Sequence, residues 1–301
     1  MNNNRNPGKI ISSILMPFIV YYLITFFVDT VFMTVLMVRH PEILNISDYE
    51  EMFNAATELT MKYRYEMLII ASAAVLPVMV RMLRDERLKD MAEGSYVLYE
   101  KPDPLAYINV AVLGISGGIL LNCLIHISGI YTLLEGEEVV SSAARTWNGN
   151  LILELLSVGI LSPAVEEITF RGLILHRFEK YVDARWALLG SAFIFSLAHG
   201  SSIQGMYAFA IGALAGFLYL RFRNVLAPFV LHVAVNITAV LQNEAHFLDA
   251  FTETTAGLTI ICAASAALFM TYFYLVLTGV EAKPVAGQGP GTTSGSTSGS
   301  M

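Results

Sequence analysis

The chain consists of long apolar stretches separated by short polar and charged segments. A helix needs about 20 mostly apolar residues to cross the hydrocarbon core of a bilayer, and eight stretches approach that length. They cover residues 10–38, 65–80, 105–128, 150–174, 186–200, 203–220, 225–241 and 257–278. The pattern predicts an all-α fold, a polytopic membrane bundle of about eight transmembrane helices.

The segments between these stretches alternate in charge. Lys and Arg gather before the first stretch and after the second, fourth and sixth, whereas the segments after the first, third and seventh are acidic. Basic residues accumulate on the cytoplasmic side of membrane proteins. The alternation therefore predicts that both termini are cytoplasmic. From residue 279 onward Gly, Ser, Thr and Pro predominate, and residues 279–301 are expected to form a flexible tail.

Composition supports an integral, multi-pass membrane protein, in the cell membrane if the host is a prokaryote. Hydrophobic residues make up 55% of the 301 residues and charged residues 14%, with a mean hydropathy of +0.59. The net charge of −7 argues against a nucleic-acid partner, because phosphate backbones require a basic surface. Cys123 and Cys262 lie in separate apolar stretches and are interpreted as small buried hydrophobes.

The first group of residues that could carry chemistry lies late in the fourth stretch. Glu166, Glu167 and Arg171 follow Ser162 and Pro163. Positions four apart share one face of a helix, so Glu167 can pair with Arg171, while Glu166 points elsewhere. We expect Glu166, which has no cation of its own on this helix, to serve as a general base. A purely structural Glu–Arg pair is the alternative for this group taken alone.

Two further pairs have the same spacing. Phe195 and His199 lie near the end of the fifth stretch, and His232 and Asn236 lie on the seventh. Each pair taken alone is more often a packing or helix-bonding feature. Together with the acidic pair, however, they provide a base, an imidazole, a cation and an amide donor, which are the groups needed to attack a carbonyl with water.

These three motifs, in this order on successive apolar segments, resemble the CPBP family of intramembrane proteases, which includes the Rce-type CAAX prenyl endopeptidases. The resemblance covers residues 150–241 and makes them the expected catalytic core, preceded by transmembrane helices and loops over 1–149 and followed by a last helix within 242–278. It implies a peptide hydrolase acting on a membrane-embedded or lipidated substrate, with a cavity that opens toward the cytosol. The implied roles are water activation by Glu166 and His199, support by Glu167 and Arg171, and oxyanion stabilisation by His232 and Asn236.

Metal involvement stays open, because the family has been described both as glutamate proteases and as metalloproteases. Two histidines and a carboxylate can hold zinc with one open position, and the set would be Glu166, His199 and His232. No His-Glu-x-x-His motif fixes two ligands on one turn. We therefore prefer water activated by Glu and His, with no required cofactor. A serine mechanism through Ser162, Ser196 or Ser201 lacks the Gly-x-Ser-x-Gly context.

Two functions from other classes compete with the protease. One is a non-catalytic immunity or scaffolding protein that binds a partner, and the other is a transporter that uses the ionisable residues as a proton relay. The motifs do not identify the substrate, the need for prenylation or the oligomeric state.

If the helices are straight, the two motif histidines lie at different depths in the membrane and cannot share one site. His199 lies about 20 Å along its helix from the cytoplasmic end, but His232 lies only about 7 Å beyond Pro228. A contiguous site therefore requires tilted helices or a break near residues 200–202. His176, toward the end of the fourth stretch, has no acidic partner at helical spacing and is interpreted as interfacial.

Overall fold

The computed structural model describes residues 6–130, 150–200, 202–245 and 254–285, which form helices and an isolated β-bridge between Tyr99 and Pro284. The predicted all-α fold class is confirmed. The helices are α1 (Pro7–Arg39), α2 (Pro41–Leu44), α3 (Tyr49–Lys62), α4 (Arg64–Ala92), α5 (Pro104–Ser128), α8 (Leu151–Glu154), η1 (Leu155–Leu161), α9 (Ser162–Glu167), η2 (Ile168–Leu175), α10 (His176–Glu179), α11 (Ala184–Leu197), α12 (Ser202–Phe222), α13 (Leu226–Ala245) and α15 (Thr255–Gly279).

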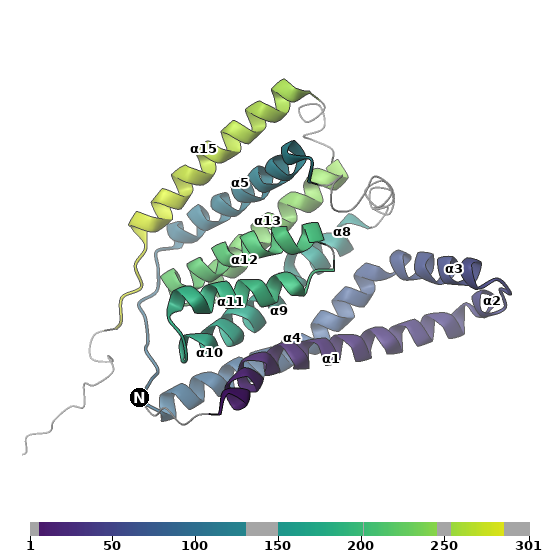
Figure 1. The fold of residues 1–301 in the computed structure, drawn as a ribbon, viewed down its shortest axis with the longest axis horizontal. Helices are drawn as coiled ribbons and strands as arrows, with labels where there is room; N and C mark the ends of the chain where they lie inside the picture. Colours follow the sequence, from purple (N-terminus) through teal and green to yellow (C-terminus); the bar gives the residue numbers. More distant parts are fainter. Residues whose placement is uncertain (1–5, 131–149, 201, 246–253, 286–301) are drawn as a thin grey trace, which may run out of the picture.

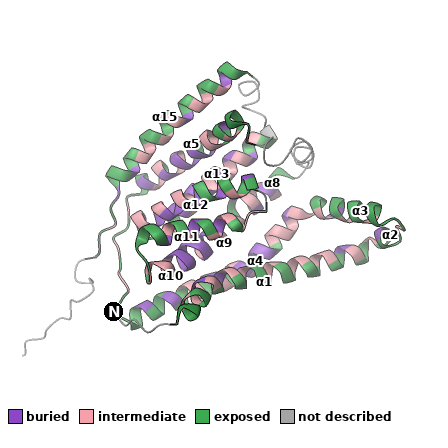
Figure 2. Ribbon diagram, in the orientation of Figure 1, coloured by how far each residue is buried: buried purple, intermediate pink, exposed green. Residues whose placement is uncertain are grey.

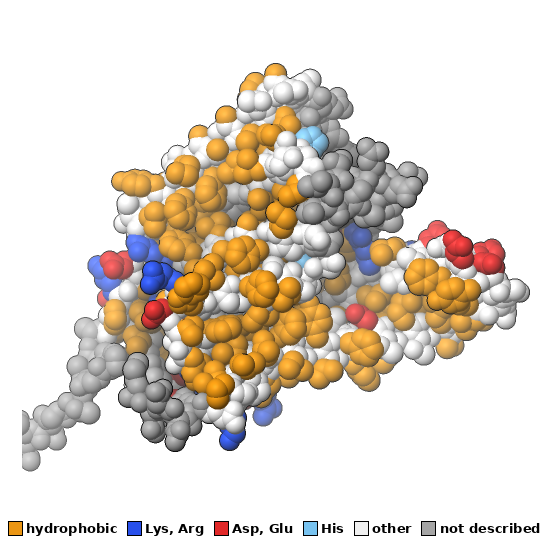
Figure 3. Space-filling view, viewed as in Figure 1, with side chains coloured by type: hydrophobic (Ala, Val, Ile, Leu, Met, Phe, Trp, Pro, Cys, Tyr) orange, Lys and Arg blue, Asp and Glu red, His pale blue; other side chains and the backbone are white. Residues whose placement is uncertain are grey.

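The helices pack as a row closed at one side by a long hairpin (Figure 1). Helix α15 packs on α5, α5 on α13, α13 on α12 and α12 on α11, while α1 and α4 pair with each other and with η1 and η2. Buried residues concentrate in the middle of this row (Figure 2). Hydrophobic side chains cover much of the surface in view (Figure 3), and Phe26 and Phe27 on α1 are 72% and 68% exposed. A surface of this kind is suited to lipid rather than water.

Among the described residues, six helices are long and apolar enough to cross a membrane: α1, α4, α5, α12, α13 and α15. Two other predicted stretches differ from simple spans. Residues 151–179 run from α8 to α10 through the π-helical segments η1 and η2, and α11 has only 14 residues. The structure confirms a multi-pass membrane protein, whereas eight spans and cytoplasmic termini stay predictions.

The acidic segment after the first stretch is helical rather than an irregular connection. It forms α2 and α3, and the Asp48 side chain caps α3 by accepting a hydrogen bond from the Glu51 N–H at 2.9 Å. An Asp followed three residues later by Glu is a helix-start signal that hydropathy does not detect. The acidic segment after the third stretch and most of the predicted tail lie outside the described residues.

Small residues allow the helix backbones to approach closely around the core. A Cβ at Gly114 on α5 would lie 2.7 Å from the Leu231 carbonyl oxygen and 2.9 Å from the Ala234 Cβ, both on α13. A Cβ at Gly118, one turn further along α5, would meet nothing nearer than 3.5 Å. Gly114 is therefore required for the α5–α13 contact.

Replacing Gly114 with Ala should destabilise the protein, because the added methyl group meets a backbone atom that cannot turn aside. Forcing atoms into a packed interior costs about 1–3 kcal/mol. Thermal unfolding of the purified protein in detergent measures the loss, and Gly118→Ala is the matched control. Equal unfolding temperatures for the two variants would contradict the prediction.

Candidate active site

Glu166 lies on a helix whose regular hydrogen bonding is interrupted by π-helical turns. The Ser162 N–H donates to the Ser157 carbonyl, five residues back. The backbone hydrogen bonds therefore follow the i→i−5 pattern of a π-helix where the chain reaches Pro163. In that register the next acceptor is the Val158 carbonyl, but Pro163 has no N–H to donate. The Asn236 side-chain amide of α13 donates to Val158 instead, at 2.9 Å. Asn236 thus satisfies a carbonyl that the proline leaves without its helical partner.

The predicted Glu167–Arg171 contact is present and deeply buried. Arg171 Nη1 donates to Glu167 Oε1 at 2.9 Å, and the two side chains are 1% and 0% exposed. Arg171 Nη2 donates to the Gly212 carbonyl of α12 at 3.0 Å, and its guanidinium lies 4.5 Å from the centroid of the Phe195 ring on α11. One arginine therefore connects three helical segments, using the planar, multi-donor geometry that a lysine lacks.

Glu167 also holds His232. The distance between His232 Nδ1 and Glu167 Oε1 is 2.7 Å, and because a carboxylate accepts, Nδ1–H is the donor. The other ring nitrogen, Nε2, lies 3.7 Å from Glu166 Oε2. The two neighbouring carboxylates therefore have different surroundings. Glu167 binds Arg171 and His232, while Glu166 faces the free side of the imidazole.

His199 lies just past the end of α11, half-buried. Its Nδ1 lies 2.9 Å from the Phe195 carbonyl oxygen, which can only accept, so Nδ1–H donates and Nε2 is left for other partners. The Phe195 ring contacts both histidines edge-on, with centroids 4.7 Å from His199 and 5.8 Å from His232. Phe195 therefore separates and orients the two imidazoles.

These side chains surround one cavity of about 180 Å³. Its lining includes Glu166, His199, His232 and Asn236, whereas Glu167 and Arg171 lie behind it. The helix arrangement thus removes the conflict in depth between His199 and His232, since both reach the same space. The full lining is Val158, Ser162, Glu166, Phe195, His199, Tyr207, Ala208, Ile211, His232 and Asn236.

Tyr207 was not singled out in the sequence. It lies on α12, lines the cavity, and its buried hydroxyl has no hydrogen-bond partner among the described residues. A lone Tyr in an apolar helix usually has its polar end satisfied or in contact with water, so the sequence alone carries no signal for it. Contact with the cavity is what makes the Tyr207 hydroxyl a candidate functional group.

A zinc ion would require the ligand atoms of Glu166, His199 and His232 to lie close together. Glu167 binds the far nitrogen of His232, as carboxylates do behind metal-bound histidines. However, the described residues whose ligand atoms all lie within 4.8 Å of one another are Glu86, Asp90 and His176, and not Glu166, His199 and His232. A zinc ion held by the active-site set would draw these three side chains closer together.

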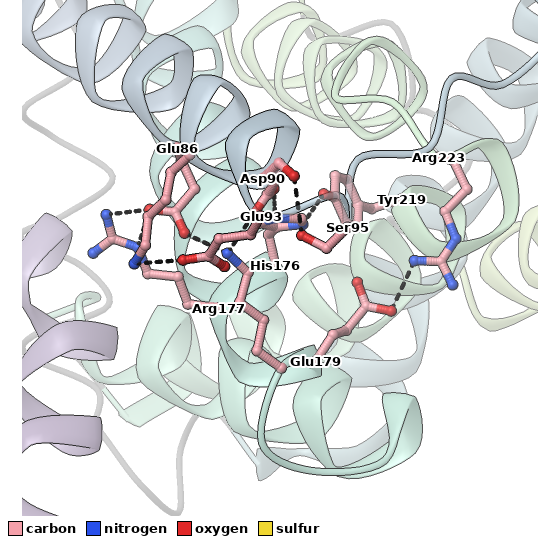
Figure 4. A network of polar contacts seen from close by, with 11 residues as sticks. Glu86, Asp90, Glu93, Ser95, His176, Arg177, Glu179, Tyr219 and Arg223 are labelled. Atoms are coloured by element: carbon pink, nitrogen blue, oxygen red, sulfur yellow. Dashed lines mark hydrogen bonds and ion pairs between the residues drawn. The ribbon is translucent and has the colours of Figure 1, made fainter. Parts of the chain in front are cut away.

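The Glu86, Asp90 and His176 group is an ion-pair network rather than a second active site (Figure 4). Lys180 Nζ lies 2.6 Å from an oxygen of Glu86 and 2.6 Å from an oxygen of Asp90, so an ammonium group already lies between the carboxylates. Burial lowers the pKa of Lys180, but its hydrogen bonds to Asp90 and Glu86 outweigh this effect and raise that pKa. His176 was interpreted as interfacial, but it is bonded to Asp90 at 2.7 Å. The network joins α4 to α10.

Comparison with known proteins identifies the part of the chain that contains the site. The family model of Rce1-like type II CAAX prenyl endopeptidases matches residues 148–238. This region is Rce1-like. The resemblance predicted from the three motifs is thereby confirmed over this region, and it supports a peptide hydrolase of the CAAX protease kind in a membrane. No curated protein and no solved structure matches the chain.

Elemental analysis of the purified protein tests the metal alternative. We expect no stoichiometric zinc that depends on Glu166, His199 or His232, because the structure does not bring all three ligand atoms within 4.8 Å of one another. Wild type is compared with each residue changed singly to Ala, and with Asp90→Ala to detect metal at the ion-pair network. One zinc per chain, lost in the three site variants and kept in Asp90→Ala, would overturn the metal-free mechanism.

Proposed function

We propose that the protein is an intramembrane endopeptidase that hydrolyses a peptide bond of a membrane-associated or lipidated substrate with water activated by Glu166. The observation that carries this proposal is the cavity inside apolar helices, where Glu166 meets two histidines and an amide. The cavity is polar where the helices around it are apolar, and its volume admits the few atoms of a scissile peptide group and a water. The Rce1-like match supports the same reaction class.

In the proposed reaction Glu166 removes a proton from water while the water oxygen attacks the carbonyl carbon. The carbonyl electrons move to the oxygen, which becomes an oxyanion. When the intermediate collapses, the C–N bond breaks, and the proton taken up by Glu166 passes to the leaving amine. His199 supports this transfer, since its Nδ1–H is bound to Phe195 and its Nε2 can accept or return a proton.

His232 and Tyr207 are the proposed partners of the oxyanion. An imidazolium donates from both ring nitrogens, so a doubly protonated His232 would bond Glu167 through Nδ1–H and donate into the cavity through Nε2–H. Arg171 in turn holds Glu167, which makes both of them positioning residues. Asn236 has one N–H committed to Val158, so its contribution as a donor is smaller than the resemblance implies. The Tyr207 hydroxyl has no such commitment to a described residue.

The competing functions lack an observation of this kind. A scaffolding or immunity protein needs the polar residues only for packing and has no use for an imidazole held by one carboxylate and facing another. A proton relay through a transporter needs a continuous path, but the Glu167–Arg171 pair closes the site on one side. Both alternatives predict that conservative changes of Glu166 leave peptide bonds in the membrane unaffected.

Glu166→Gln should abolish proteolysis without unfolding the protein, because the amide keeps the shape and removes the base. Peptide termini in membranes from cells expressing wild type or Glu166→Gln are compared at equal expression. New termini should appear with wild type and be absent with Glu166→Gln. Glu93→Gln, which removes an exposed carboxylate at the end of α4, should match wild type. Identical termini in all three samples would favour the binding function.

Tyr207→Phe should lower kcat by about 10²–10³, the usual cost of losing one oxyanion donor, with little change in KM. The measurement uses the substrate identified by the termini above. Tyr272→Phe on α15, away from the cavity lining, is the matched control. Unchanged kcat in Tyr207→Phe would show that this hydroxyl takes no part in the reaction.

A further inference from the structure

Helix α1 lies outside the region that matches the family, yet it contacts the helices that form the site. The match covers residues 148–238, whereas α1 covers Pro7–Arg39. Besides α4, the neighbours of α1 are η2 and α10, which belong to the matched region. Two hydrogen bonds from side chains to backbone carbonyls fix how α1 lies against them.

The first bond compensates for a proline inside α1. Pro17 has no N–H, so the Ser13 carbonyl lacks the donor that would normally lie four residues further on. Arg177 Nη1 of α10 donates to that carbonyl at 2.6 Å. Arg177 also binds Glu86 of α4, through Nε at 3.0 Å and Nη2 at 2.9 Å (Figure 4). The ion-pair network that joins α4 to α10 therefore also fixes the position of α1 along its axis.

The second bond reaches the turn that carries His199. Tyr22 lies nine residues after Ser13, about 14 Å further along α1. Its hydroxyl donates to the Ala198 carbonyl at 3.1 Å, and Ala198 directly precedes His199 at the end of α11. The last carbonyls of a helix have no partner within that helix. In an apolar environment they need a donor from elsewhere, and Tyr22 provides one for Ala198.

Aromatic contacts connect the same part of α1 to the other side of the imidazole. The Phe18 ring lies 4.7 Å from the Tyr22 ring and, edge-on, 6.2 Å from the Phe170 ring of η2, measured between centroids. Phe170 lies edge-on to Phe195 at 4.9 Å, and the Phe195 carbonyl accepts from His199 Nδ1–H. His199 is thus held by Phe195 within its own helix and by Tyr22 through the preceding residue.

Tyr22 does not line the cavity, so it does not contact a substrate there. Its effect has to pass through Ala198 to the imidazole of His199. Proton transfer requires the donor and acceptor to lie within about 2.6–3.2 Å of each other. A displacement of about 1 Å can cost about 10²-fold in rate. A contact that fixes the backbone next to His199 is therefore important for the reaction.

We propose that α1 is part of the active site and that Tyr22 is a positioning residue, which holds His199 at the cavity through the Ala198 carbonyl. The use of His199 in catalysis rests on the proposed function, whereas the holding of the turn rests on the contacts alone. The catalytic unit then extends beyond the region that matches the family, to a tyrosine 176 residues earlier in the chain than its partner.

Hydrogen exchange tests the holding of the turn without any substrate. The Ala198 and His199 amides donate to carbonyls of the last turn of α11, and they exchange when this turn opens. Tyr22→Phe keeps the ring and removes the hydroxyl. Exchange in a peptide covering residues 195–200 should become about 2–10-fold faster, which corresponds to the net strength of one hydrogen bond. Tyr274→Phe, an exposed tyrosine on α15, is the control and should leave this peptide unchanged.

Kinetics with the substrate identified by the Glu166-dependent termini test the effect on the reaction. Tyr22→Phe should lower kcat by about 2–10-fold, with KM and the unfolding temperature close to those of wild type. Tyr22→Leu, which also removes the ring contact with Phe18, should lower kcat further. A wild-type kcat in Tyr22→Phe with a loss only in Tyr22→Leu would show that the ring packs and the hydroxyl positions nothing, which would overturn the inference.

The two measurements separate this inference from the proposed function. Equal exchange in wild type and Tyr22→Phe would overturn the inference, and so would faster exchange with an unchanged kcat, while proteolysis would stand in both cases. If no termini depend on Glu166, the proposed function fails. The exchange of residues 195–200 in Tyr22→Phe then decides by itself whether α1 holds the turn at His199.

Discussion

The buried contact between Glu167 and Arg171 is the interaction on which the site depends. Neither charge has access to solvent, so each requires the other, and breaking such a pair costs far more than forming it contributes. Arg171 Nη2 also donates to the Gly212 carbonyl, and Glu167 Oε1 also accepts from His232 Nδ1–H. The ion pair thus sets the positions of α12 and α13 relative to the helix that carries Glu166.

A second constraint comes from proline in the same helix. Pro163 has no N–H with which to continue the backbone hydrogen bonds of the π-helical turn. The Asn236 side chain on α13 donates to the Val158 carbonyl in its place. The residues that hold the helices together are therefore next to those assigned to the chemistry, and some of them serve both purposes. This overlap explains why these polar groups are tolerated in an apolar interior, since Arg171, Glu167 and Asn236 each bond a group on another helix.

Much of this arrangement could be predicted from the sequence, and the reason is local spacing. The Glu167–Arg171 pair and the grouping of Glu166, His199 and His232 follow from helical periodicity and apolar context. The contacts between helices do not, because they depend on tilt and on where each helix begins. The contact between His232 and Glu167 at 2.7 Å sets the level of α13 beside the helix that carries Glu166, and no feature of residues 225–241 indicates that level. The partner of His176 was missed for the same reason, since Asp90 is 86 residues away.

Helix α11 differs in length from its neighbours, and this matters for the lipid around it. Its 14 residues span about 21 Å, whereas the 33 residues of α1 span about 50 Å. A bilayer adapts to a short hydrophobic segment by thinning beside it, and to a long one through helix tilt. A helix as short as α11 favours a thinner bilayer beside its end at His199. The proposed hydrolysis consumes one water for every bond cut, and a thinner bilayer there would shorten the path by which that water arrives.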